Sequence, residues 1–342
     1  MLGRLKILSN LPGVSGDEGP VRRYIRKEIE PLVDEIRVDH IGNLYAYQYG
    51  EGPTVMLTAH MDEVGFQIRG ILEDGLLAYE EEGIDPRVVL SKRVKVGKNA
   101  ISGVIGVKAH HLQKKSDFAH VLEHNELFID IGASSKEDAE KYVEVGDYAW
   151  FDTACTAFGD GLIKGKALDD RVGCAILMEL LKKRYPCNLV AVFATQEEVG
   201  HRGAAIAAQR VKPDLCIILE GTTANDTVDA PLHKQVTSLR HGPAITFMDG
   251  SVIVPEALVR ALKNAAEEAG IPYQLRRGTT GSTDAGIVQQ TGAGCVAGGI
   301  SVPCRYIHGP CSVAAVQDIE NTYRLMDRFL EEEAYKEALK NG

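Results

Sequence analysis

The sequence predicts an α/β protein with a mainly parallel, doubly wound sheet and an inserted β-rich domain. Helical patterns and apolar runs of strand length alternate over residues 1–66 and 163–342, which is the rhythm of such a sheet. Between these segments, residues 67–162 contain short apolar stretches separated by glycine-rich turns. We therefore expect one α/β domain built from both outer segments and a separate β-rich domain at 67–162.

The first outer segment contains three predicted elements. Ser15 and Glu18 have the spacing of a capping box, and apolar residues then recur at helical intervals to residue 29. Residues 36–50 predict a hairpin with its turn near Gly42-Asn43. Residues 54–60 are an apolar run of strand length, as in a strand buried on both faces.

The second outer segment contains the remaining alternation. Within the insertion, only residues 135–142 have a helical pattern. After it we expect helices at 170–185, 203–211, 255–270 and 284–292, a last helix from about Val313, and strands at 188–195, 214–220, 272–278 and 294–302.

Composition and charge limit the function classes. The 342 residues are 44% hydrophobic and 25% charged, with a formal net charge of −10, which argues against non-specific nucleic-acid binding. No apolar run approaches the ~20 residues of a membrane span, and the first residues lack a signal-peptide core. The seven cysteines are scattered, odd in number and without a CxxC pair. We therefore expect reduced thiols in a cytoplasmic protein that binds neither nucleic acid nor membrane.

Metal-ligand residue types follow several predicted strands. In open α/β sheets, sites form beyond the carboxyl ends of the strands. Strand ends deliver His60, Glu198, Glu220 and His308, and Asp169 stands at the start of a helix. These are the ligand types of a zinc-like divalent ion, with no thiolate required.

Five ligands exceed the need of one tetrahedral ion. They suit two ions bridged by one carboxylate and one water or hydroxide. Three carboxylates and a hydroxide would balance the four positive charges of two divalent ions. Glu197 is then left beside the ions without binding them, and it is suited to be the general base that moves a proton to the leaving amine.

Each residue also has an ordinary structural interpretation. A single His after a strand is usually structural, although Asp62 could accept the second N–H of His60. Asp169-Asp170 could be only a helix cap, and adjacent glutamates are usually solvated. A surface position is favoured for His201, with a pocket role left open by its closeness to Glu198, and for four histidines of the insertion, His110, His111, His120 and His124. Of the cysteines, Cys304 and Cys311 have a meaningful chance of lying near the site.

Six motifs occur in an order that resembles the M42 metallo-aminopeptidases. They are "TAHMDEVG", "KALDDRVG", "TQEEVGHRGA", "EGTTAND", "GSTDAG" and "SVPCRYIHGP". This family includes glutamyl aminopeptidases, the tetrahedral TET peptidases and proteins once labelled endoglucanase M. The resemblance covers nearly the whole chain, and it implies the dinuclear zinc-peptidase type of α/β fold.

The resemblance implies roles for individual residues. His60, Asp169 and Glu220 would hold one metal, and Asp169, Glu198 and His308 the other, with Asp169 bridging. Glu197 would be the general base, Asp62 would orient His60, and Asp170 would have a supporting role. Many relatives carry Asp where this chain has Glu220, a change that bears on metal preference or occupancy. Zinc or cobalt would be the metals, two ions per subunit.

The resemblance also implies a reaction and an assembly. The reaction is hydrolysis of the N-terminal peptide bond of short peptides, with a hydroxide that bridges the metals as nucleophile. The insertion resembles a dimerisation domain, whose dimers assemble further in this family, often into a tetrahedral dodecamer. Independently, a β-rich insertion must cover its edge strands, which also favours a homo-oligomer.

Two rival functions remain as alternatives. One is another dinuclear hydrolase on the same fold, a deacylase or a glycosidase, although a glycosidase needs two free carboxylates that flank a sugar. The other is a non-catalytic assembly protein, which loss of a ligand or of Glu197 would signal. The preferred N-terminal residue stays open, because Arg276, Arg277 and His201 could favour acidic side chains or could be solvated charges.

Overall fold

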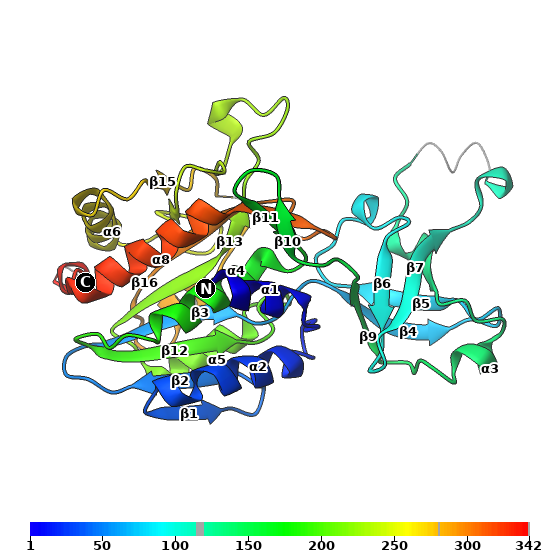
Figure 1. The fold of residues 1–342 in the computed structure, drawn as a ribbon, viewed down its shortest axis with the longest axis horizontal. Helices are drawn as coiled ribbons and strands as arrows, with labels where there is room; N and C mark the ends of the chain where they lie inside the picture. The colour runs from blue at the N-terminus through cyan, green and yellow to red at the C-terminus, as the bar shows by residue number, and fades with distance from the viewer. Residues whose placement is uncertain (114–119, 280, 341–342) are drawn as a thin grey trace.

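Two bodies lie side by side in the computed structural model, which describes residues 1–113, 120–279 and 281–340 (Figure 1). The larger body contains both chain termini and a mixed sheet with helices, and the smaller body is a closed β-barrel. Each body has its own apolar core. The predicted α/β fold with an inserted β-rich unit is therefore confirmed.

The sheet of the larger body is mixed, with four parallel strands at its centre and one short parallel pair, β14 and β15, at its side. Its strand order is β1-β2-β12-β3-β13-β16-β17-β11-β10, with β14 and β15 beside β16. The bounds are β1 Glu35–Val38, β2 Leu44–Gln48, β3 Thr54–His60, β10 Thr156–Phe158, β11 Leu162–Gly165, β12 Asn188–Ala194, β13 Leu215–Thr223, β14 Ala244–Ile245, β15 Gln274–Leu275, β16 Val296–Arg305 and β17 Ser312–Ala315. Strands β12, β3, β13 and β16 pair in parallel, whereas the flanking strands pair antiparallel. Short connections give the antiparallel pairs β1–β2, β10–β11 and β16–β17, whereas β2–β12 and β11–β17 pair strands that are distant in the sequence.

Helices pack around this sheet in two groups. Helix α4 contacts both α1 and α8, whereas α5 contacts α7 and β12. Strand β13 contacts both α4 and α7 and is buried along almost its whole length, as in a strand covered on both faces. The bounds are α1 Leu2–Asn10, α2 Gly19–Ile29, α4 Leu168–Leu180, α5 Arg202–Val211, α6 Glu256–Glu268, α7 Asp284–Gln290, α8 Val316–Glu331 and α9 Tyr335–Leu339. In the described part of the chain, no helix combines the length and apolar character that a membrane crossing demands.

Two predicted helix starts were wrong. Ser15 does not cap α2; its Oγ donates to Asp62 Oδ2 at 2.8 Å, and the helix begins at Gly19. The last helix begins at Val316 rather than near Val313, because residues 312–315 pair with β11 and β16 as strand β17. In both cases a long-range contact takes precedence over the local pattern.

The smaller body is a barrel of six strands in the order β4-β5-β8-β7-β6-β9. The bounds are β4 Phe66–Ile71, β5 Leu77–Glu81, β6 Arg93–Val96, β7 Ile101–Val107, β8 Leu127–Asp130 and β9 Tyr148–Phe151, with a short helix α3 at Lys136–Ala139. Strands β10 and β11 belong to the large sheet, so strand pairing ends the barrel before residue 156 rather than at 162. In the described part of the barrel, every strand pairs on both sides, so no edge strand is left open. The expectation that edge strands need a second subunit to cover them therefore does not apply.

Candidate metal centre

The parallel centre of the sheet brings the predicted ligands to one edge. Residue Ala194 of β12 is in register with His60 of β3, and the chain continues from these strands into Glu197 and Asp62. A cavity of about 750 Å³ lies at this edge. It is lined by all five predicted ligands and by the predicted base: His60, Asp169, Glu198, Glu220, His308 and Glu197. Residues from five separate segments thus meet at the carboxyl ends of parallel strands.

His60 lies between two carboxylates. Its Nδ1 is 3.4 Å from Asp62 Oδ1 and its Nε2 is 3.5 Å from Asp169 Oδ1. Asp62 also accepts hydrogen bonds from the backbone N–H groups of Glu197 and Glu198. Although burial opposes ionisation, its contacts with His60 and its other hydrogen bonds lower the pKa of Asp62. Asp62 therefore contacts the imidazole and also holds the backbone that carries both glutamates.

The adjacent residues Asp169 and Asp170 face different surroundings. Both have non-helical backbone angles at the start of α4. Asp169 lines the cavity, whereas Asp170 is fully buried and accepts hydrogen bonds from the backbone N–H groups of His60 and Gly173. This geometry agrees with Asp169 as a ligand and Asp170 as its support.

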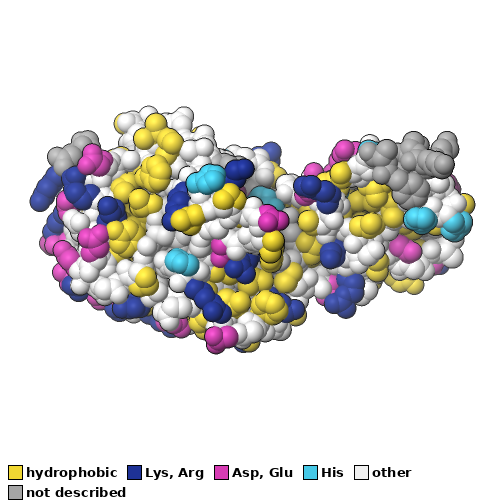
Figure 2. Space-filling view, turned by 90° about the horizontal axis from the view of Figure 1, so that it is seen from above, with side chains coloured by type: hydrophobic (Ala, Val, Ile, Leu, Met, Phe, Trp, Pro, Cys, Tyr) yellow, Lys and Arg dark blue, Asp and Glu magenta, His cyan; other side chains and the backbone are white. Residues whose placement is uncertain are grey.

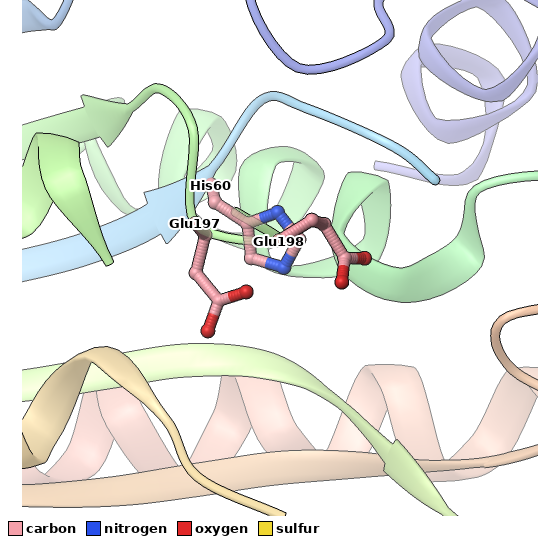
Figure 3. Close-up of side chains that lie close together, drawn as sticks. All are labelled: His60, Glu197 and Glu198. Carbon is pink, nitrogen blue, oxygen red and sulfur yellow. The ribbon is translucent and has the colours of Figure 1, made fainter. Parts of the chain in front are cut away.

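Among the described residues, three sets of side chains have ligand atoms close enough for one ion, and two of these sets contain predicted ligands. In the first, ligand atoms of Asp169, Glu198 and His308 lie within 4.8 Å of one another, which matches one predicted set. In the second, His60 groups with Glu197 and Glu198, whose side chains point toward the same space (Figure 3). The other predicted set differs from this second group, because it joins His60 to Asp169 and Glu220 and leaves Glu197 free.

The donor set fits divalent cations. The side chain of Glu198 is 5% exposed and Glu220 is 6% exposed. Burial first, and the charge of Asp169 in addition, raise the pKa values of Glu198 and Glu220 well above the usual range. Such crowded carboxylates are costly unless a cation compensates them. Two imidazoles and three carboxylates are ligands that zinc-like ions accept.

His308 is the most exposed of the predicted ligands. Its side chain is 42% exposed, and its Nε2 lies 3.4 Å from Glu198 Oε2. Its Nδ1 lies 3.0 Å from the carbonyl oxygen of Gly83, in the connection between β5 and β6 of the barrel. The barrel connection therefore contacts a predicted ligand. No local pattern in the sequence predicts this contact between Gly83 and His308. The surface is indented between the two bodies (Figure 2).

Several residues have positions that differ from the sequence interpretation. His201 and Arg276 line the cavity, whereas Arg277 is exposed. Among the insertion histidines, only His124 is half-buried, with Nε2 2.8 Å from the Ile84 carbonyl oxygen, and His110, His111 and His120 are exposed. All seven cysteines are free, and neither Cys304 nor Cys311 lines the cavity. Asp284 and Ser282, which contact His201, were not singled out at all; the motif "GSTDAG" was the available signal.

Comparison with known proteins gives concordant results. A model of the M42 glutamyl aminopeptidase family matches residues 42–325. A putative aminopeptidase of Acetivibrio thermocellus is 38% identical over 95% of this chain and 97% of its own length. The structure of a TET aminopeptidase from Thaumarchaeota archaeon SCGC AB-539-E09 superposes with a TM-score of 0.93, at 32% identity, over 98% of each chain. The TET1 peptidase of Pyrococcus horikoshii, described as assembling into a tetrahedron or a large octahedral shell, superposes with a TM-score of 0.87, at 32% identity, over 97% of this chain and 99% of its own.

Proposed function

We propose that this chain, which belongs to the M42 glutamyl aminopeptidase family and is a peptide hydrolase, removes the N-terminal residue from short peptides at the cavity described above. The observation that supports this site most strongly is the convergence of five ligand-type side chains and one further glutamate on a single cavity. Its volume of about 750 Å³ is within the usual range for small-ligand sites.

Two divalent ions, zinc or cobalt, are proposed as cofactors. Asp169, Glu198 and His308 would hold one ion, and His60, Asp169 and Glu220 the other. Asp169 is the natural shared ligand, because it contacts His60 and also groups with Glu198 and His308. When bound, such ions supply Lewis acidity and lower the pKa of water.

Glu197 is proposed to move the proton. Its carboxylate would accept a proton from the attacking water and deliver it to the nitrogen of the leaving amine. Its backbone N–H donates to Asp62, which anchors it beside His60. Glu198 has the same backbone anchor, but its side chain groups with Asp169 and His308 as well as with His60, whereas Glu197 groups with His201 and Asp284. The two adjacent glutamates thus have surroundings that suit different tasks.

We also propose a homo-oligomer with a dimer as its building block. The support is the similarity to TET peptidases, of which P. horikoshii TET1 is described as a tetrahedron or a larger shell. The barrel offers exposed apolar side chains for the dimer contact, among them Val104, Leu112, Val121, Tyr142 and Val145. A tetrahedral dodecamer is the further assembly proposed. A monomer in light scattering at micromolar concentration would contradict both.

Free cysteines support a proposed location. All seven are unpaired, which suits a reducing compartment such as the cytoplasm.

A panel of aminoacyl anilides, assayed with added zinc or cobalt, tests the proposed function. We expect release of the anilide from some free-amine substrates and none from the same substrates with an acetylated amine. Cleavage of the acetylated substrates would favour a deacylase or an endopeptidase. Hydrolysis of glycosides alone would favour the glycosidase alternative.

A further inference from the structure

A cluster of three side chains, His201, Asp284 and Ser282, lies against the predicted base. His201 Nδ1 lies 2.9 Å from Glu197 Oε1 and 3.2 Å from Asp284 Oδ1. The other ring nitrogen, Nε2, lies 3.0 Å from Ser282 Oγ. Asp284, at the start of α7, is 1% exposed, so a buried carboxylate holds the same ring nitrogen that faces Glu197.

We propose that His201 is a positioning residue for the reaction, and that Asp284 and His201 together hold the carboxylate of Glu197 in the orientation that proton transfer requires. The proposal rests on the proposed function, because it assigns Glu197 the role of base. It adds residues that belong neither to the metal ligands nor to the pair His60 and Asp62.

The local backbone is shaped for this contact. His201 has φ 57 and ψ 31, in the left-handed region, at the residue that precedes α5. Non-glycine residues are uncommon in that region. The backbone N–H of His201 donates to the Glu197 carbonyl oxygen at 2.9 Å, which closes a turn and brings the imidazole back over the glutamate four residues earlier. Geometry therefore directs His201 to Glu197, whereas a helical residue at the same place would point elsewhere.

Charge supports the same assignment. The carboxylates of Asp284 and Glu197 raise the pKa of His201 to about 10, so both ring nitrogens carry a proton at neutral pH. Nδ1 then donates to Asp284 Oδ1, and Nε2 donates to Ser282 Oγ. The ring also lies 2.9 Å from Glu197 Oε1, so it restrains that flexible glutamate by contact and by opposite charge.

Two substitutions distinguish the role of the His201 side chain from the role of its left-handed backbone conformation. His201→Gly keeps the left-handed conformation without strain and removes the donor. His201→Asn also tolerates that conformation, and its amide nitrogen is as many bonds from Cα as Nδ1 of histidine. We expect kcat to fall on the order of 10- to 100-fold for His201→Gly, the scale of a misplaced catalytic group, and to recover in large part for His201→Asn. KM and metal content should stay within about twofold of wild type in both, since neither variant alters a ligand or the substrate cavity beyond this side chain.

The outcomes discriminate clearly. Equal kcat for the Gly and Asn variants, or loss of metal together with activity, would overturn the positioning role. Loss of a metal ion in both His201→Gly and Asp284→Asn would show instead that Glu197, His201 and Asp284 form an ion site. An inactive wild-type protein would count against the proposed function. In that case crystal structures of the two variants still decide the inference: the Glu197 carboxylate should be displaced in His201→Gly and in place in His201→Asn, and an unmoved carboxylate in both would refute it.

Discussion

The larger body and the barrel differ in whether they bury charged side chains. Both have a closely packed apolar core. In the larger body, charged side chains such as His60, Asp62, Asp170 and Glu220 are also buried. Among the residues that the structure describes, none of the buried polar or charged side chains lies between 66 and 151. Burying a charged side chain lowers the stability of the folded protein, so the buried charges of the larger body cost it stability. The barrel core contains apolar side chains and carries no such cost.

The two bodies meet at one of the predicted ligands. His308 comes from the larger body, and the Gly83 carbonyl oxygen, 3.0 Å from its Nδ1, comes from the barrel connection. When a ring nitrogen binds metal, the partner of the other nitrogen fixes the orientation of the ring. The barrel thus contributes to the site through the carbonyl group that holds the His308 ring, although its core supplies neither a predicted ligand nor the predicted base.

Removal of the metal should have the largest effect on activity. Its effect on stability should be confined to the larger body. We expect chelation to abolish activity and to lower the melting temperature of the larger body, because its buried carboxylates lose their compensating charge. Two divalent ions per chain should restore both properties. Activity and elemental analysis are the measurements, and full activity with one bound ion per chain would contradict the dinuclear site.

Substitution of the two adjacent glutamates should separate proton transfer from metal binding. We expect Glu197→Gln to lower kcat roughly 10²–10⁴-fold with metal content unchanged, because the general base is lost and the ligands remain. Glu198→Gln should lower metal affinity, and excess metal should partly restore its rate. If Glu197→Gln lost its metal and recovered on metal addition, the two roles would be reversed.

A cavity in the barrel core should lower stability without changing the chemistry. Ile129 is fully buried in the barrel, and Ile129→Ala should lower the free energy of unfolding by about 2–5 kcal/mol. Ile253, 73% exposed in the larger body, is the matched control, and Ile253→Ala should change that free energy by less than about 0.5 kcal/mol. Denaturant unfolding measures both. A large loss of kcat in folded Ile129→Ala would show that the barrel core is coupled to the site.

A substitution at the contact between the two bodies should have the smallest effect, and this effect should be on metal affinity. A Cβ added at Gly83, where φ is +67, would lie 3.2 Å from His308 Nδ1. We expect Gly83→Ala to weaken metal binding on the order of tenfold, because the ring of His308 must shift. Gly132 controls for backbone strain, since its φ is +79 and an added Cβ meets nothing within 4 Å. Metal titration that showed the same affinity for both variants would exclude a role for the Gly83 contact.

The sequence by itself determined the centre of the fold and the residue types of the site. Apolar runs such as 54–60 become parallel strands wherever helices cover both faces. Polar residues that follow those strands must then meet at one edge of the sheet, because parallel strands all end on the same side. His60, Glu198 and Glu220 could therefore be grouped from the sequence alone, although which of them lie close enough to share one ion could not.

Only the tertiary structure decided the contacts that cross long stretches of chain. Ser15 donates to Asp62 from 47 residues away, His201 lies against Asp284 across 83, and His308 meets Gly83 across 225. Barrel closure and the pairing of β17 are of the same kind, since each depends on which strands lie side by side. Local patterns report which face a residue presents to its own helix or strand. They carry no information on which distant group will fill the space opposite, and that group sets a side chain's hydrogen bonds, charge and role.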